Sequence, residues 1–176
     1  MKNFTKSLIG LLLYFFLIFV CVYLFSHYVT GGSIVDGPSM NDTLQDGDRL
    51  VLNKFTYRVT DLDRFDIIVF KYAYDTDTYY VKRIIGLPGE SVRIDEQGQI
   101  WINDELLEEN YGKETMEDPG IAAEPVNLRA GEYFVLGDNR NNSEDSRYAD
   151  MGNVKKRNII GKVWFIASPW SRFGFV

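Results

Sequence analysis

The chain has 176 residues, of which 45% are hydrophobic, 19 are Lys or Arg and 25 are Asp or Glu, with a single His and a single Cys. One Cys excludes an intrachain disulfide and a Cys-rich zinc site, and His27 with Cys21 cannot supply a Cys/His ligand set. Both lie in or beside an apolar N-terminal segment, which also excludes Ser-His-Asp and Cys-His nucleophiles. Any catalysis must therefore depend on carboxylates, hydroxyls, Lys, Arg or Tyr.

The charge is unevenly distributed along the chain. Lys2 and Lys6 are the only bases before His27, and no acid precedes Asp36, so 17 bases face 25 acids in the remainder. Nucleic-acid binding requires clustered Lys and Arg to neutralise phosphates, so we expect no nucleic-acid partner. The length suits one medium domain with a short appendage.

The first predicted element is a membrane anchor. The segment from Ser7 to Ser26 carries no charge, and at about 1.5 Å per residue it spans roughly 30 Å, the thickness of a hydrocarbon core. The basic N-terminus is typical of the cytoplasmic side. We therefore expect a cytoplasmic tail at 1–6, a transmembrane helix at 7–27 and an extracytoplasmic domain at 28–176. A cleaved secretory signal is the alternative, although the apolar run is longer than the usual ~7–15 residues and lacks an A-x-A-like site.

The remainder predicts a mainly β domain of barrel-like type. Runs rich in β-branched and aromatic residues alternate with Gly, Pro, Asn and Asp. A hairpin is expected where 92–94 and 100–102 alternate at period two around 95–98. The acidic, aperiodic segment at about 105–130 is expected to be a variable exposed excursion. The predicted strands are 33–35, 49–53, 66–72, 79–85, 91–94, 100–103, 133–136 and 159–167.

Ser39 lies in the first segment that could carry chemistry, the turn Asp36-Gly37-Pro38-Ser39-Met40. Gly37 leaves room for another backbone to approach, and Pro38 fixes the chain entering Ser39. An ordinary turn serine is the alternative interpretation.

Lys82 lies in the second segment, 79–90. In a strand it shares a face with Tyr80 and Ile84, while Arg83 points the opposite way. A lysine held in such apolar surroundings must find a partner or lose its proton. A lysine that reaches the surface is the alternative.

The third segment, 137–147, is a dense polar loop after an apolar strand. A solvated surface loop is one interpretation. It lacks the Gly that a calcium-binding loop requires, so calcium binding is not expected. Its paired opposite charges and short hydroxyls suit a rigid network beside a buried base.

In this order the segments resemble the motifs of the bacterial type I signal peptidases, and the single-span form is similar to Gram-positive members. The resemblance runs from the anchor to about Ile166. The motifs are Gly37-Pro38-Ser39-Met40, Gly47-Asp48 with Leu50-Val51-Leu52, Arg64-Phe65-Asp66 followed by Ile67-Ile68-Val69-Phe70, Tyr80-Val81-Lys82-Arg83 followed by Ile84-Ile85-Gly86-Leu87-Pro88-Gly89-Glu90, and Gly137-Asp138-Asn139-Arg140 with Ser143, Asp145, Ser146 and Arg147.

The resemblance implies a signal-peptidase/LexA-like, β-barrel-type catalytic domain and a membrane-bound serine endopeptidase without metal or cofactor. Ser39 would be the nucleophile and Lys82 the general base, cutting exported preproteins after A-x-A-like sites. Ser143 would orient the Lys82 amine, and the Ser39 backbone N–H would stabilise the oxyanion. A structural network would comprise Arg83, Asp138, Asp145 and Arg147. The expected substrate-binding residues are Ile34, Val35, Gly37, Met40, Leu44, Tyr80 and Val81.

Two positions depart from the family pattern. Gly37 stands where some members have a Ser that adds a second oxyanion donor, and Asp42 stands where Pro is common. An extended substrate is expected to bind by strand addition, and the aromatic tail at 169–175 to lie at the membrane interface or to pack back onto the domain. The alternatives are a noncatalytic membrane-anchored binding protein on the same fold and a self-cleaving repressor-type regulator, against which the acidic charge argues.

Overall fold

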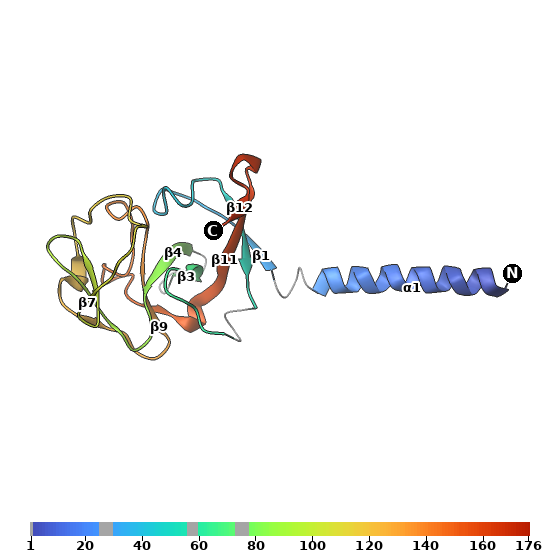
Figure 1. Ribbon diagram of the computed structural model, residues 1–176, viewed down its shortest axis with the longest axis horizontal. Coiled ribbons are helices and arrows are strands. Elements are labelled where there is room, and N and C mark those ends of the chain that lie inside the picture. Colours follow the sequence, from blue (N-terminus) through green and yellow to red (C-terminus); the bar gives the residue numbers. More distant parts are fainter. Residues whose placement is uncertain (1, 25–29, 56–59, 73–77) are drawn as a thin grey trace.

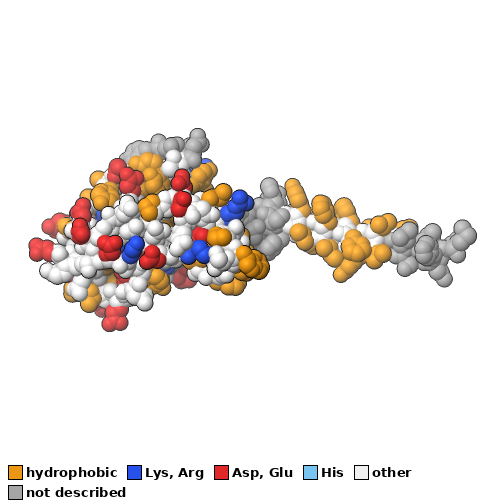
Figure 2. Space-filling model, turned by 90° about the horizontal axis from the view of Figure 1, so that it is seen from above, with side chains coloured by type: hydrophobic (Ala, Val, Ile, Leu, Met, Phe, Trp, Pro, Cys, Tyr) orange, Lys and Arg blue, Asp and Glu red, His pale blue; other side chains and the backbone are white. Residues whose placement is uncertain are grey.

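The computed structural model describes residues 2–24, 30–55, 60–72 and 78–176, with side chains described from 9 to 23 within the first range and from 31 onward in the second. Helix α1 (Lys2–Leu24) extends away from a β-rich domain (Figure 1). Its described side chains are mostly exposed apolar groups, including Leu11, Phe16 and Phe19 (Figure 2). Within the described residues, no helix has both the length and the hydropathy of a membrane span.

The larger sheet brings together strands that are far apart in the sequence. Its antiparallel order is β1-β2-β11-β3-β4-β9-β10, and β12 pairs with β11. The long strand β11 joins the N-terminal β1–β2 pair to β3 and β4, with Val163 opposite Leu52 and Lys162 opposite Ile68. The bounds are β1 Thr30–Ile34, β2 Arg49–Asn53, β3 Ile67–Lys71, β4 Tyr79–Gly86, β9 Glu132–Leu136, β10 Val154–Lys155, β11 Ile159–Ser168 and β12 Gly174–Phe175.

The smaller sheet contains the predicted hairpin. Strands β5 (Ser91–Ile94) and β6 (Ile100–Ile102) pair antiparallel, with Arg93 opposite Trp101. Asp95 closes the turn, since it accepts hydrogen bonds from the backbone N–H groups of Gln97 and Gln99 and from the Trp101 indole. Strands β7 (Glu105–Leu106) and β8 (Val126–Asn127) complete this sheet.

Alternation along β3 separates the core of the larger sheet into two clusters. Ile68 and Phe70 belong to a cluster that includes Ile84 and Tyr133, whereas Ile67 and Val69 pack with a cluster on the opposite face. Successive side chains of a strand point to opposite faces, so a strand that is apolar throughout is buried on both. The neighbouring strand β4 therefore runs through the interior, and its polar residues must be satisfied there.

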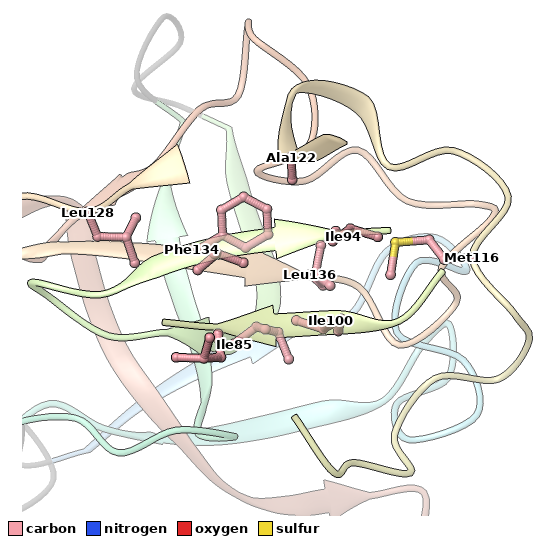
Figure 3. Packing of buried hydrophobic residues seen from close by; sticks show 10 residues of the cluster. Ile85, Ile94, Ile100, Met116, Ala122, Leu128, Phe134 and Leu136 are labelled. Carbon is pink, nitrogen blue, oxygen red and sulfur yellow. The ribbon is translucent and has the colours of Figure 1, made fainter. Parts of the chain in front are cut away.

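A third cluster joins the two sheets and corrects one expectation. Met116, Ala122 and Leu128 from the expected excursion are buried against Ile85, Phe134 and the β5–β6 hairpin (Figure 3). The segment 105–130 is therefore only partly exposed. Met116, Ala122 and Leu128 are too widely spaced to produce a periodic pattern, yet all three are buried in this cluster, whereas Leu106 and Ile121 of the same segment are exposed.

The mainly β prediction is confirmed, and each of the eight predicted strands has a counterpart. The pairing among the described strands of the larger sheet runs in an open path from β1 to β10, rather than the closed ring of a barrel. The four strands that were not predicted, β7, β8, β10 and β12, have two residues each.

Candidate active site

Ser39 comes from the segment between β1 and β2, Lys82 comes from β4, and their side chains are hydrogen-bonded to each other. The Lys82 ammonium donates to Ser39 Oγ at 2.6 Å. Ser39 lies in the turn region between β1 and β2, and Lys82 lies within β4, opposite Ile68 of β3. The Asn139 backbone N–H donates to the Ser39 carbonyl at 3.1 Å, which fixes the turn against the polar loop.

The environment of Lys82 favours its neutral form. Its side chain is 2% exposed and shares a face with Tyr80, whose ring centroid lies 5.4 Å from Nζ. Burial lowers the pKa of Lys82 from its ordinary 10.5 to about 8, an effect that Arg147 reinforces and the charges of Asp145, Glu144 and Asp138 oppose. Desolvation is therefore the dominant cause, because it disfavours the charged ammonium.

Arg83, the next residue of β4, forms a buried two-point ion pair on the opposite face. Its guanidinium donates to the Asp138 carboxylate at 2.9 and 2.7 Å, and both side chains are almost fully buried. The Thr43 hydroxyl also donates to Asp138, at 2.5 Å. These contacts join the strand that carries Lys82 to the start of the polar loop and to the segment that follows Ser39.

Asp145 and Arg147 form a second buried pair within the loop. Arg147 donates to Asp145 at 2.8 and 2.9 Å, and also to the carbonyls of Asp118 and Arg140. Asp145 in turn accepts from the Gly137 backbone N–H at 3.1 Å. A charge at this depth requires such a complete set of partners, so the pair fixes the loop conformation.

Ser143 differs from the expectation that it hydrogen-bonds the Lys82 amine. Its hydroxyl oxygen is buried and has no hydrogen-bond partner in the described part of the chain. It packs closely against Gly137, where a Cβ atom would overlap the hydroxyl and lie 2.5 Å from the Ser39 carbonyl oxygen. The Lys82 amine donates to Ser39 instead, so Ser143 is beside the pair without bonding to it.

A cleft of about 340 Å³ opens beside Ser39 and Lys82. Five of the expected substrate-binding residues line it, namely Ile34, Val35, Gly37, Tyr80 and Val81. Met40 and Leu44 do not, because both are fully buried in the apolar cluster around Val163. The lining residues that were not predicted to bind substrate are Ser33, Pro38, Leu50, Val69, Thr78, Tyr79 and Glu144.

The backbone conformation of Gly37 affects whether residue 37 could supply a second donor to the oxyanion. Gly37 has φ +90°, a conformation that favours glycine. Its N–H donates to the Asp46 carboxylate at 2.9 Å. This N–H is therefore engaged by Asp46, and a serine at position 37 would have to adopt a strained backbone.

Several residues of the polar network were not found by sequence reasoning. The Tyr111 ring lies 3.7 Å from the Arg83 guanidinium carbon, and Glu109 forms a 2.8 Å ion pair with Arg140. Tyr111 and Glu109 both lie in the segment 105–130, which was expected to be exposed. Its acidic composition, with one aromatic residue, did not indicate contacts with Arg83 or with the polar loop 137–147. In the ranges that the structure covers, no group of three or more His, Cys, Asp or Glu side chains is arranged to hold a metal ion.

Comparisons with known proteins agree on one family. A family model described as signal peptidase, peptidase S26, matches residues 8–170. Signal peptidase I T of Bacillus subtilis strain 168 is 36% identical over 84% of this chain and 79% of its own length. Signal peptidase I P of Bacillus subtilis subsp. natto is 36% identical over 94% and 87%. The probable signal peptidase I-2 of Synechocystis is 37% identical over 85% and 68%. A crystal structure of a signal peptidase I from Enterococcus faecalis is 35% identical, with a TM-score of 0.47, over 58% of this chain and 97% of that one.

Proposed function

The chain belongs to the peptidase S26 family of signal peptidases, and we propose that it removes signal peptides with Ser39 as nucleophile and Lys82 as general base. The 2.6 Å hydrogen bond between the two side chains, with Lys82 buried, is the observation that carries this proposal. A serine hydroxyl is a weak nucleophile until an adjacent base accepts its proton. The relatives support the activity, removal of signal peptides. The hydrogen bond supports the roles given to Ser39 and Lys82.

The proposed reaction proceeds through an acyl-enzyme. Ser39 Oγ attacks the scissile carbonyl carbon while its proton passes to neutral Lys82, and the carbonyl oxygen becomes an oxyanion near the Ser39 backbone N–H. Lys82 then gives this proton to the departing amine as the C–N bond breaks. A water molecule, deprotonated by the again neutral Lys82, attacks the ester. Lys82 returns this proton to Ser39 Oγ as the acyl–oxygen bond breaks, which releases the signal peptide and restores both side chains.

Two free strand edges support substrate binding by strand addition. β1 is the first strand of the larger sheet, and β9 pairs with β4 only from Arg83 onward. Among the described strands, Tyr79–Lys82 therefore has no partner on its outer edge, and this edge and β1 both border the cleft. We propose that an extended peptide occupies the cleft, with small residues preceding the cut because the apolar floor includes Val35, Leu50 and Val81.

The pH dependence of cleavage tests the role of Lys82. A general base must be neutral, and with a pKa of about 8 about a quarter of the enzyme has neutral Lys82 at pH 7.5, against about one in a thousand for an ordinary lysine. We expect kcat/KM for a peptide with an A-x-A site to rise roughly tenfold per pH unit below the pKa and to level off above it. A rate that is flat or falls between pH 6.5 and 9 would contradict this role. Circular dichroism at each pH checks that the enzyme remains folded.

We also propose a single-pass topology with the N-terminus in the cytoplasm and 28–176 outside. The uncharged segment from Ser7 to Ser26 and the preceding lysines support it. Trp170 and Phe175 are 84% and 80% exposed, and β12 lies on the side of the domain nearest α1 (Figure 1). β12 also pairs with β11, so the tail packs onto the domain and still presents aromatic rings to the membrane interface.

Membrane extraction tests this topology. We expect the full-length chain to remain in the membrane pellet after alkaline carbonate treatment, and protease added outside cells to digest the β domain. N-terminal sequencing of the membrane-bound protein should begin at or near Met1. A shorter soluble product that begins after Ser26 would instead support a cleaved secretory signal.

A further inference from the structure

Around the cleft, the acidic side chains are accessible to a substrate and the basic side chain is not. Asp36 and Glu144 line it, and both are exposed. Lys82 is the one basic residue among the lining residues, and it is buried with its amine bonded to Ser39. A peptide entering the cleft therefore meets two accessible carboxylates and no accessible cation from these lining residues.

The position of Glu144 is defined by its neighbours. Asp145 is fixed by its buried pair with Arg147, which restricts the backbone at Glu144. The Tyr80 hydroxyl donates to the Glu144 carboxylate at 3.1 Å, and the Tyr80 ring packs beside the Lys82 amine. The carboxylate thus lies at the cleft edge, close to the reacting groups, and remains open to solvent.

We propose that Glu144 is a specificity residue that favours substrates with Lys or Arg near the scissile bond, an inference that rests on the proposed function. Tyr80 and Lys82 are two residues apart in β4, or about 7 Å along the strand. Because a bound peptide would run along this edge, a residue within about three positions of the cut could approach Glu144. Opposite charges at an exposed site attract moderately, and salt screens the attraction.

Two other roles for Glu144 predict different behaviour. If Glu144 acted only through the Lys82 amine, its removal would change the cleavage rate of every substrate by the same factor. If it only held Tyr80, the charge of the substrate would be irrelevant. The ratio of kcat/KM between two peptides cut by the same enzyme cancels both effects, so this ratio isolates the direct interaction.

The experiment uses the full chain in neutral detergent and peptides with one A-x-A site. Lys, Gln or Glu is placed in turn at each position within three residues of the cut, except the two required alanines. At one or more positions we expect wild type to cut the Lys peptide roughly threefold faster than the Gln peptide and the Glu peptide roughly threefold slower. Glu144→Gln should move these ratios towards one, with any remaining preference due to Asp36, and Glu144→Lys should move them further in the same direction. Glu96→Gln, which makes the same change in a distant exposed turn, should leave them as in wild type.

Each remaining outcome has a distinct meaning. Ratios that are the same in wild type and Glu144→Gln overturn the specificity proposal but leave the proposed function intact. Failure of wild type to cut any peptide overturns the proposed function and this inference with it. A salt series on wild type gives a check without substitutions, because the Debye length falls from about 10 Å at 0.1 M to about 3 Å at 1 M. Charge preferences that persist at 1 M salt would also overturn the proposal.

Discussion

Replacing Ser39 with Ala or Lys82 with Met is expected to lower the cleavage rate of a preprotein with an A-x-A site by about three orders of magnitude or more. Ser39→Ala removes the atom that forms the ester, and Lys82→Met removes the group that accepts its proton at 2.6 Å. Groups that act as a unit have strongly non-additive effects. The double variant should therefore be about as inactive as either single variant, measured as the initial rate of preprotein processing in detergent.

The stability of Lys82→Met provides a check that is independent of catalysis. The pKa of Lys82 in the folded chain is about 8, against an ordinary 10.5, so between these values the unfolded chain holds a proton that the folded chain has released. Wild-type stability should therefore rise with pH across this window, and below it folding must bury a charged amine. Lys82→Met should be more stable than wild type at pH 7, on the order of 1–3 kcal/mol.

Matched controls distinguish loss of chemistry from loss of structure. Lys156→Met changes a lysine on the surface that is paired with exposed Asp61, and Ser171→Ala changes an exposed serine in the tail. Both variants should retain wild-type processing. Substantial activity in Ser39→Ala or in Lys82→Met would show that another residue is the nucleophile or the base.

The strands were predictable where side-chain alternation has a local cause. In β5 and β6, Val92, Ile94 and Ile100 face one cluster, and Asp95 with Gly98 marks the turn between the strands. Strands of two residues cannot show a period, and β8 forms where Val126 meets Val92 of β5, a residue 34 positions earlier in the chain. Such pairings are determined by the packing of the whole domain, which no local window of sequence contains.

Sequence motifs predicted which residues belong to the candidate site, but they did not predict all of the contacts between these residues. The resemblance identified Ser39, Lys82 and the charged residues of the loop, but it placed Met40 and Leu44 in the cleft, although their apolar side chains are completely buried. The contact of Tyr111 with Arg83 depends on how the segment after β7 crosses the polar loop. Glu144 enters the site through a hydrogen bond to a residue 64 positions earlier, a relation that spacing along the chain does not reveal.

Arg147→Met is expected to lower the free energy of unfolding by about 3–5 kcal/mol. It leaves the Asp145 carboxylate, which is fully buried, without its ionic partner, and removing one member of a buried pair costs about this much. For a chain of this length the change corresponds to a fall in Tm of roughly 6–20 °C. Thermal unfolding in detergent, followed by circular dichroism, measures it.

Two further variants test whether the loss of stability comes from the unpaired Asp145 carboxylate. Asp145→Asn combined with Arg147→Met should recover part of the lost stability, because no uncompensated charge is then buried. Arg129→Met changes an exposed arginine and should remain within about 0.5 kcal/mol of wild type. If Arg147→Met unfolded within about 1 kcal/mol of wild type, the loop would not depend on this pair as the geometry indicates.

The same substitution should also move the pH profile of any activity that remains. Arg147 lowers the pKa of Lys82, whereas Asp145 raises it. Without Arg147, its lowering effect on the pKa of Lys82 is lost while the raising effect of Asp145 remains, so this pKa should increase. The rise in kcat/KM should therefore move to more alkaline pH. A purely structural role for Arg147 would lower the rate without moving its midpoint, so the profile tests whether the loop also sets the proton affinity of the base.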